Sequence, residues 1–214
     1  LHMPNFHKLQ ELLPKLGQIR MVQANYSQYS SRYDKYLEGT VLPAFDPQLS
    51  GGALYDINIY NLNLIIGLFG APNNLIYQAR KGFNGIDTSG VVLMSYPEFQ
   101  ALAIGAKDSD SPSTCLIQGE KGWLKVETAP NQLEKIACQI RGEDNIQEYA
   151  LNQYPHRLSH EFAAFAAMLA NKDFAGRDLY LNISLQVAEA AEKSRKQADI
   201  SFLADQYLRS VPGG

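Results

Sequence analysis

Residues 50–70 read SGGALYDINIYNLNLIIGLFG and form the most apolar helix candidate of the chain. An α-helix turns by about 100° per residue, so Asp56, Tyr60, Asn63 and Gly67 fall within a sector of about 60°. Most of the remaining helix surface is leucine, isoleucine and phenylalanine. The stretch therefore predicts a largely buried helix that carries one narrow polar stripe.

This polar stripe has two interpretations. A buried carboxylate must be paired or hydrogen-bonded, because burying it alone is very costly. In the structural interpretation, Asp56 caps a neighbouring loop and Tyr60 packs in the core with its hydroxyl satisfied. In the functional interpretation, both side chains project into a cleft, where a phenol donates a proton to a carbonyl or takes one from a hydroxyl. A phenol used in this way needs a nearby cation, since the ordinary pKa of tyrosine is about 10.

Hydrophobic periodicity places further helices and strands around this segment. Helical spacing predicts a helix over 4–16, and alternation predicts a strand over 18–29, followed by a loop over 30–50. The central helix, 52–69, stops at the Gly-Ala-Pro sequence that follows it. Period-two patterns then predict strands at 74–81, 89–97, 99–106, 113–119, 121–127 and 134–140, and helical spacing returns over 156–171 and 178–197.

The order of these elements favours one α+β domain over residues 1–214. A run of strands followed by a run of helices is typical of this class. We expect an open, mostly antiparallel sheet of about six strands, with the helices packed on one face. Several strands are rich in large apolar residues, so we expect a second copy of the chain to cover the other face.

The composition is that of an ordinary globular domain. The chain has 214 residues, of which 45% are hydrophobic and 19% charged, and its net charge is −3. Lysine and arginine are scattered, so no nucleic-acid partner is expected, and no apolar run approaches the ~18 residues of a membrane span. Cys115 and Cys138 predict reduced thiols in a cytoplasmic protein, with a disulfide as the alternative.

Several catalytic and ligand motifs are absent from the sequence. Without a GxGxxG or GxxxxGK[ST] pattern, this chain by itself is not expected to hold a dinucleotide. Without GxSxG, and with neither cysteine near a histidine, nucleophilic catalysis is disfavoured. His156 and His160 lie four apart, which fits two ligands of a metal, but no third ligand is spaced to complete the site. We therefore expect no metal and interpret His160 as a polar residue of a first helical turn.

Four pieces of the chain, the last of which is a pair of helical segments, resemble in sequence and in order the C-terminal domain of the Gfo/Idh/MocA oxidoreductases. GGALYDINIYNLNLIIGLFGAPN is similar to the signature Gly-Gly-(Gly/Ala)-x-x-Asp-x-Gly-x-His/Tyr-x-x-Asp, in the tyrosine form typical of the dihydrodiol dehydrogenase-like branch. LGQIRMVQANYSQYSSRYD resembles the long first strand and its Ser-x-Arg-Tyr loop, and STCLIQGEKGWLKVE resembles the glycine hairpin. HEFAAFAAMLAN and LNISLQVAEAAEKSRKQADISF resemble the two closing helices.

The resemblance implies the substrate-binding and oligomerisation domain of a two-domain enzyme. A Rossmann domain is then expected to precede Leu1, to bind NAD or NADP, and to supply the lysine of a Glu-Lys-Pro motif. The present chain alone is expected to bind no cofactor and to be inactive. The family's open sheet face implies homo-oligomers.

Site residues follow from matching positions. Tyr60 matches the catalytic His/Tyr, a general acid/base on the substrate oxygen, and Asp56 matches the Asp that orients the substrate or the acid/base. Arg32 and Tyr33, in the preceding loop, are expected to contact the substrate. The implied function is that of the substrate-side half of an NAD(P)-dependent dehydrogenase acting on a hydroxyl or carbonyl of a sugar, polyol or diol.

Two positions depart from the signature. Asn58 replaces the usual glycine, which is expected to alter how closely another backbone approaches. Asn63 replaces the second Asp and removes a charge from the stripe, although we retain it as a substrate contact. These departures leave room for two alternatives, a non-catalytic ligand-sensing or regulatory protein and a module that serves oligomerisation only.

Overall fold

The computed structural model describes residues 1–205 of the chain. These residues form one eight-stranded sheet with the order β2-β3-β4-β1-β5-β6-β7-β8. β1 and β4 run parallel, and the other neighbouring strands are antiparallel. The strands are β1 (Ile19–Ser27), β2 (Asn74–Lys81), β3 (Asp87–Ser95), β4 (Gln100–Ala106), β5 (Thr114–Gly119), β6 (Gly122–Val126), β7 (Ile136–Ile140) and β8 (Gln147–Tyr149).

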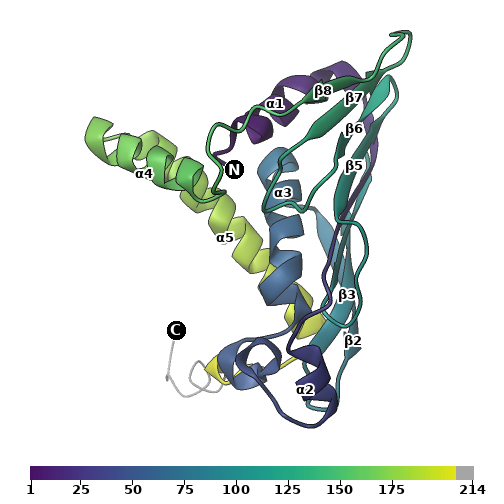
Figure 1. Ribbon diagram of the computed structural model, residues 1–214, viewed down its shortest axis with the longest axis vertical. Coiled ribbons are helices and arrows are strands. Elements are labelled where there is room, and N and C mark those ends of the chain that lie inside the picture. Colours follow the sequence, from purple (N-terminus) through teal and green to yellow (C-terminus); the bar gives the residue numbers. More distant parts are fainter. Residues whose placement is uncertain (206–214) are drawn as a thin grey trace.

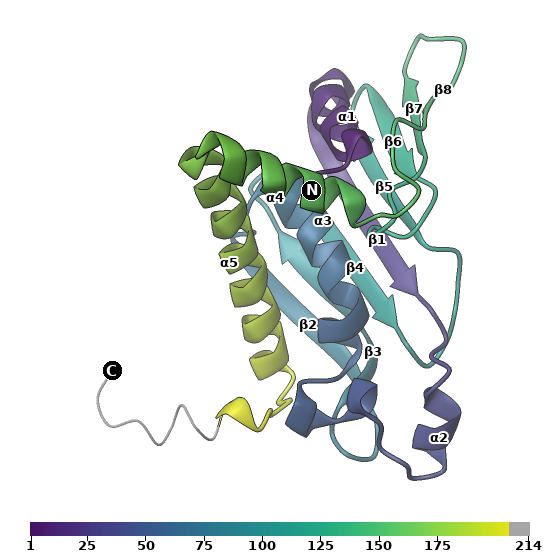
Figure 2. The same cartoon turned by 60° about the vertical axis from the view of Figure 1, so that its left-hand side comes forward.

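The long helices lie on one face of this sheet (Figure 1). α3 lies over β1 and β4 and runs roughly along them, and α5 packs beside it (Figure 2). The predicted α+β class, with an open and mostly antiparallel sheet, is confirmed. The helices are α1 (Pro4–Leu12), α2 (Tyr33–Leu37), α3 (Ile59–Phe69), α4 (Ser159–Asn171) and α5 (Phe174–Gln197), and a π-helical turn, η4 (Leu54–Asn58), precedes α3.

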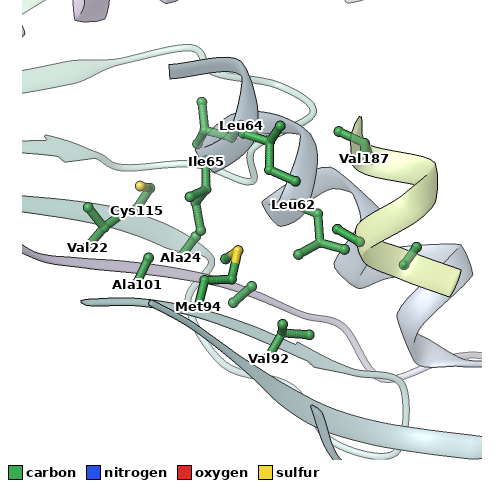
Figure 3. Packing of buried hydrophobic residues seen from close by; sticks show 14 of the residues in the cluster. Val22, Ala24, Leu62, Leu64, Ile65, Val92, Met94, Ala101, Cys115 and Val187 are labelled. Carbon is green, nitrogen blue, oxygen red and sulfur yellow. The ribbon is translucent and has the colours of Figure 1, made fainter. Parts of the chain in front are cut away.

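The hydrophobic core lies between the inner face of the sheet and these helices. Leu62 and Ile65 of α3 are at most 1% exposed and point toward β1, β3 and β4 (Figure 3). Val187 of α5 packs against the far side of α3, so α3 is enclosed between the sheet and α5. Among residues 1–205, no helix is long and apolar enough to cross a membrane.

Several predicted boundaries are corrected by the structure. The sheet has eight strands, and the additional β8 pairs with β7. The predicted loop 30–50 contains α2 and two 3₁₀ turns, at Pro43–Phe45 and Pro47–Leu49. The last helix begins at residue 174, not 178, because the Asp173 side chain accepts a hydrogen bond from the Gly176 N–H at 2.9 Å and caps it.

The predicted helix over 52–69 is regular only from Ile59 onward. Its first part, η4, is a π-helical turn. A π-turn closes i→i+5 hydrogen bonds and so takes one more residue per turn than an α-helix. The regular 100° spacing that grouped Asp56 with Tyr60 therefore does not apply before α3.

Candidate active site

Two glycines set the start of the segment that carries the site. Gly52 has φ +104°, and a Cβ there would lie 2.1 Å from Asp87 Oδ1. A Cβ on Gly51 would lie 2.7 Å from the Pro43 carbonyl oxygen. The Gly-Gly pair is therefore required by positive φ at one position and by close packing at both.

Asp87 is the buried acceptor against which this turn is built. Its Oδ2 accepts hydrogen bonds from the Leu54 N–H at 2.6 Å and from the Tyr77 hydroxyl at 2.7 Å. Burial raises the pKa of Asp87, and the hydrogen bonds from Tyr77 and Leu54 oppose that rise. A carboxyl group on β3 thus anchors the first turn of the motif to the sheet.

Tyr60, in the first turn of α3, lies in the wall of a cavity of about 830 Å³. Its ring centroid is 5.9 Å from that of Tyr26, and the guanidinium carbon of Arg157 lies 6.0 Å from it. Asn131 donates to the Tyr26 hydroxyl at 3.4 Å, and Asn131 also lines the cavity. The phenol thus lies among amide, hydroxyl and guanidinium groups, which suit a substrate rich in oxygen atoms.

The cavity is enclosed by α3 on one side and by the α4–α5 hairpin on the other. Asn63 of α3 lines it together with Tyr60, so the structure brings these two predicted residues together. The opposite wall is more apolar. It includes Phe165, Met168, Leu169, Phe174, Tyr180 and Leu181.

Asp56 lies apart from this cavity lining and pairs with a lysine that sequence analysis missed. Lys107 Nζ is 2.5 Å from Asp56 Oδ2. The Asp56 side chain is 53% exposed, whereas that of Lys107 is 2% exposed. The sequence predicted that the Asp56 carboxylate is buried and needs a partner. In the structure, the buried member of the pair is Lys107.

Lys107 follows the last residue of β4, and its environment is unusual for a lysine. Burial lowers its pKa, and the hydrogen bond and charge of Asp56 act in the opposite direction. In the sequence, a lysine after an apolar strand looks like any surface lysine. Its one distinguishing signal would have been the preceding run AIGA, which ends a strand that lies deep in the sheet.

Arg32 and Tyr33 lie near Lys107 rather than in the cavity wall. Arg32 is exposed, and its charge contributes to the lowered pKa of Lys107. Tyr33 packs its ring against those of Tyr36 and Phe45, with centroids 6.0 and 5.6 Å away. The five predicted residues thus fall into two groups, Tyr60 with Asn63 in the cavity, and Asp56, Arg32 and Tyr33 around Lys107.

Asn58 replaces the glycine of the signature and is fully buried. Its side-chain amide donates to the Ala103 carbonyl at 3.0 Å, which ties η4 to β4. The close approach is provided by Gly105 on the strand, where a Cβ would lie 2.6 Å from Asn58 Cβ. The substitution is therefore accommodated by the strand that faces it.

His160 and the two cysteines are buried. His160 is 7% exposed in the first turn of α4, and its Nε2 accepts a hydrogen bond from the Tyr154 N–H at 3.4 Å. No group of three or more potential metal-ligating His, Cys, Asp or Glu residues is found within residues 1–205. Cys115 and Cys138 are both buried and free, and burial raises the pKa of Cys115 to about 12.

The sequence of this region matches a known protein family. Residues 6–125 match the GFO/IDH/MocA C-terminal domain family. This chain belongs to that family. The matched range contains the Gly-Gly pair, η4, Tyr60 and Lys107, and ends within β6.

Two curated relatives cover nearly the same part of the chain. A scyllo-inositol 2-dehydrogenase (NADP(+)) of Bacillus subtilis (strain 168) is 34% identical over 204 residues, which are 95% of this chain and 62% of that protein. An uncharacterized oxidoreductase of Escherichia coli (strain K12) is 35% identical over 205 residues, 95% of this chain and 61% of that protein. The chain thus spans less than two thirds of the length of these GFO/IDH/MocA relatives.

Solved structures share the fold at lower sequence identity. A 3-ketoreductase from Actinomadura kijaniata, in complex with NADP and TDP-benzene, matches with a TM-score of 0.73 and 18% identity over 94% of this chain and 61% of that one. An aldose-aldose oxidoreductase from Caulobacter crescentus matches with a TM-score of 0.69 and 19% identity over 91% of this chain and 59% of that one. These likenesses confirm the fold.

Proposed function

We propose that this chain is the substrate-side domain of an NAD(P)-dependent oxidoreductase that acts on a hydroxyl or carbonyl group of a sugar, polyol or diol. The observation that carries the proposal is the position of Tyr60. It occupies the His/Tyr position of the motif, and it lines the cavity of about 830 Å³ together with Asn63, Asn131 and Arg157. The similarity to a scyllo-inositol dehydrogenase supports a polyol as the first substrate to test.

The chemistry proposed for this chain is movement of a proton at Tyr60. In the oxidation direction, the substrate hydroxyl gives its proton to the Tyr60 oxygen as the carbonyl forms, and in reduction the proton returns. Asn63, Asn131 and Arg157 offer hydrogen bonds to further substrate oxygens. A nicotinamide cofactor, when bound in the full-length protein, supplies or accepts the hydride.

We infer that the described residues of this chain do not by themselves form a nucleotide site. Within residues 1–205, the Gly-Gly pair that opens η4 follows a 3₁₀ turn, and a Cβ at either glycine would collide with the protein itself. The pair is thus filled by packing and cannot cradle a pyrophosphate. We therefore propose that NAD or NADP is held by another domain of the full-length protein.

The apolar side of the α4–α5 hairpin is consistent with such a domain. Phe162, Leu169 and Phe174 are 69, 80 and 60% exposed. Large exposed apolar patches often mark an interface. This surface adjoins the cavity of Tyr60, where a second domain would complete the site.

The decisive experiment uses the full-length protein with scyllo-inositol, other polyols, sugars and diols, and with both NAD⁺ and NADP⁺. We expect Tyr60→Phe to lower kcat by about 100-fold or more, because general acid/base groups contribute about 10²- to 10⁴-fold. Tyr149→Phe, which removes a hydroxyl on β8, is the matched control and should leave turnover unchanged. Unchanged turnover in Tyr60→Phe would refute the catalytic role. Ligand binding without turnover in the wild-type protein would favour the alternative of a non-catalytic ligand-sensing protein.

We also propose that the chain forms homo-oligomers through the open face of the sheet. The helices leave this face uncovered, and Ile76 and Leu93 are 46 and 36% exposed on neighbouring strands. Light scattering should report an oligomer, and an Ile76→Lys/Leu93→Lys double variant should shift it toward the monomer. A wild-type monomer would count against this interface and would favour neither enzyme nor sensor.

A further inference from the structure

Lys107 makes three contacts that together fix its ammonium group. Nζ donates to Asp56 Oδ2 at 2.5 Å and to the Ala44 carbonyl at 2.7 Å, and it lies 4.4 Å from the Phe45 ring centroid. The ammonium group has three hydrogens, and these contacts take up the directions in which they point. The residue as a whole is 1% exposed, so its rotamer is held by packing as well.

The backbone of Lys107 joins the same region from the other side. Its N–H donates to the Thr88 carbonyl at 2.9 Å, and its carbonyl accepts from the Ser30 N–H at 2.9 Å. The residue thus connects β3, the segment that leads into α2, and the segment before η4. Its ammonium group is fixed relative to the sheet and does not follow a mobile loop.

A buried ammonium group is an expensive way to fill space. Methionine has a similar length and would occupy the same volume without desolvating a charge. Asp87 is the other carboxyl group near Lys107, and its Oδ2 accepts hydrogen bonds from Tyr77 and Leu54. Within residues 1–205, Asp87 forms no ion pair with a cation. The ion pair is instead made with Asp56, whose side chain is half exposed.

We propose that Lys107 is a positioning residue for Asp56. Its ammonium group holds Oδ2, so that the carboxylate keeps one orientation and Oδ1 remains free to accept a hydrogen bond from a substrate hydroxyl. This inference rests on the proposed function, because it needs a substrate on the Asp56 side of the motif. It adds a residue 51 positions away from Asp56 in the sequence to the machinery of the site.

The test is a double-mutant cycle on the full-length protein, with Lys107→Met, Asp56→Asn and both changes together. We expect each single change to lower kcat/KM by at least 10-fold, and the double variant to be no worse than the poorer single variant, because both remove one unit. A role in folding alone would give losses that multiply with those of Asp56→Asn. Multiplied losses, or full activity in Lys107→Met, would overturn the proposal.

Two controls keep this test separate from stability and from the proposed function. Lys81→Met removes a lysine at the end of β2 that donates to the Ala198 carbonyl at 2.6 Å, and it should leave kcat/KM unchanged. If Lys107→Met does not fold, Lys107→Gln keeps a donor for the Ala44 carbonyl and replaces it in the cycle. If Tyr60 proves to have no catalytic role, the double-mutant cycle can still be measured, either from the remaining turnover or from the Kd of scyllo-inositol. Absence of both turnover and binding would overturn the inference together with the function.

Discussion

The segment 51–69 and the α4–α5 hairpin line the same cavity but are held in different ways. The first is enclosed by the sheet and α5, with Leu62 fully buried and its first turn anchored on Asp87. In the hairpin, Leu169 is 80% exposed, and the buried residues of α5 lie in its second half. The described residues therefore fix the position of Tyr60 by close packing, whereas they leave much of the opposite wall exposed.

Truncating one leucine in each region gives the largest expected difference. Leu62→Ala should lower the free energy of unfolding by about 3 kcal/mol, because it opens a cavity in the core. Leu169→Ala should change it by less than about 0.5 kcal/mol, since the side chain is mostly exposed. Urea unfolding of both variants measures the two values. Equal losses would show that the hairpin is as firmly packed as α3.

Adding a methyl group at Gly52 tests the anchor of the first region. Gly52→Ala should destabilise the fold by about 2 kcal/mol or more, because it combines a positive φ with a contact on Asp87. Gly39→Ala is the matched control. Gly39 has φ +89° and open space around its Cβ position, so its cost should be about 1 kcal/mol from the backbone alone. Thermal unfolding of the two variants measures these losses of stability. Equal losses would contradict this account.

The pH dependence of stability should show a smaller effect of the same anchor. The pKa of Asp87 is raised in the folded state, so its contribution is fully present below an unfolded pKa of about 3.9 and is lost as pH rises through the folded pKa. Asp87→Asn should remove this dependence, which cannot exceed about 1.4 kcal/mol per pH unit for one proton. Urea unfolding at a series of pH values from about 4 upward should then favour the variant increasingly as the pH rises. A difference that stays constant with pH would assign the anchor to hydrogen bonding alone.

The sequence could predict the elements whose pattern is local. Seven strands and the core helix follow from apolar spacing, and one helix face carries both Tyr60 and Asn63, which line the same cavity. β8 was missed because three residues are too few for a period to appear. The π-turn was missed because it depends on contacts with the sheet. The Leu54 N–H donates to Asp87 of β3, and the Asn58 side chain donates to the Ala103 carbonyl of β4. No local sequence pattern records such contacts.

The features of the candidate site also divide into those set by local sequence and those set by long-range contacts. The sequence by itself determined the fold class, the buried α3 and the residue types of the motif, because burial requires a regular spacing of apolar side chains. Only the tertiary structure decided that Asp56 is half exposed, that Lys107 is buried against it, and that Tyr60 faces a cavity. The physical reason is that an ion pair between residues 51 positions apart depends on strand order and register, which the chain acquires only when the sheet forms.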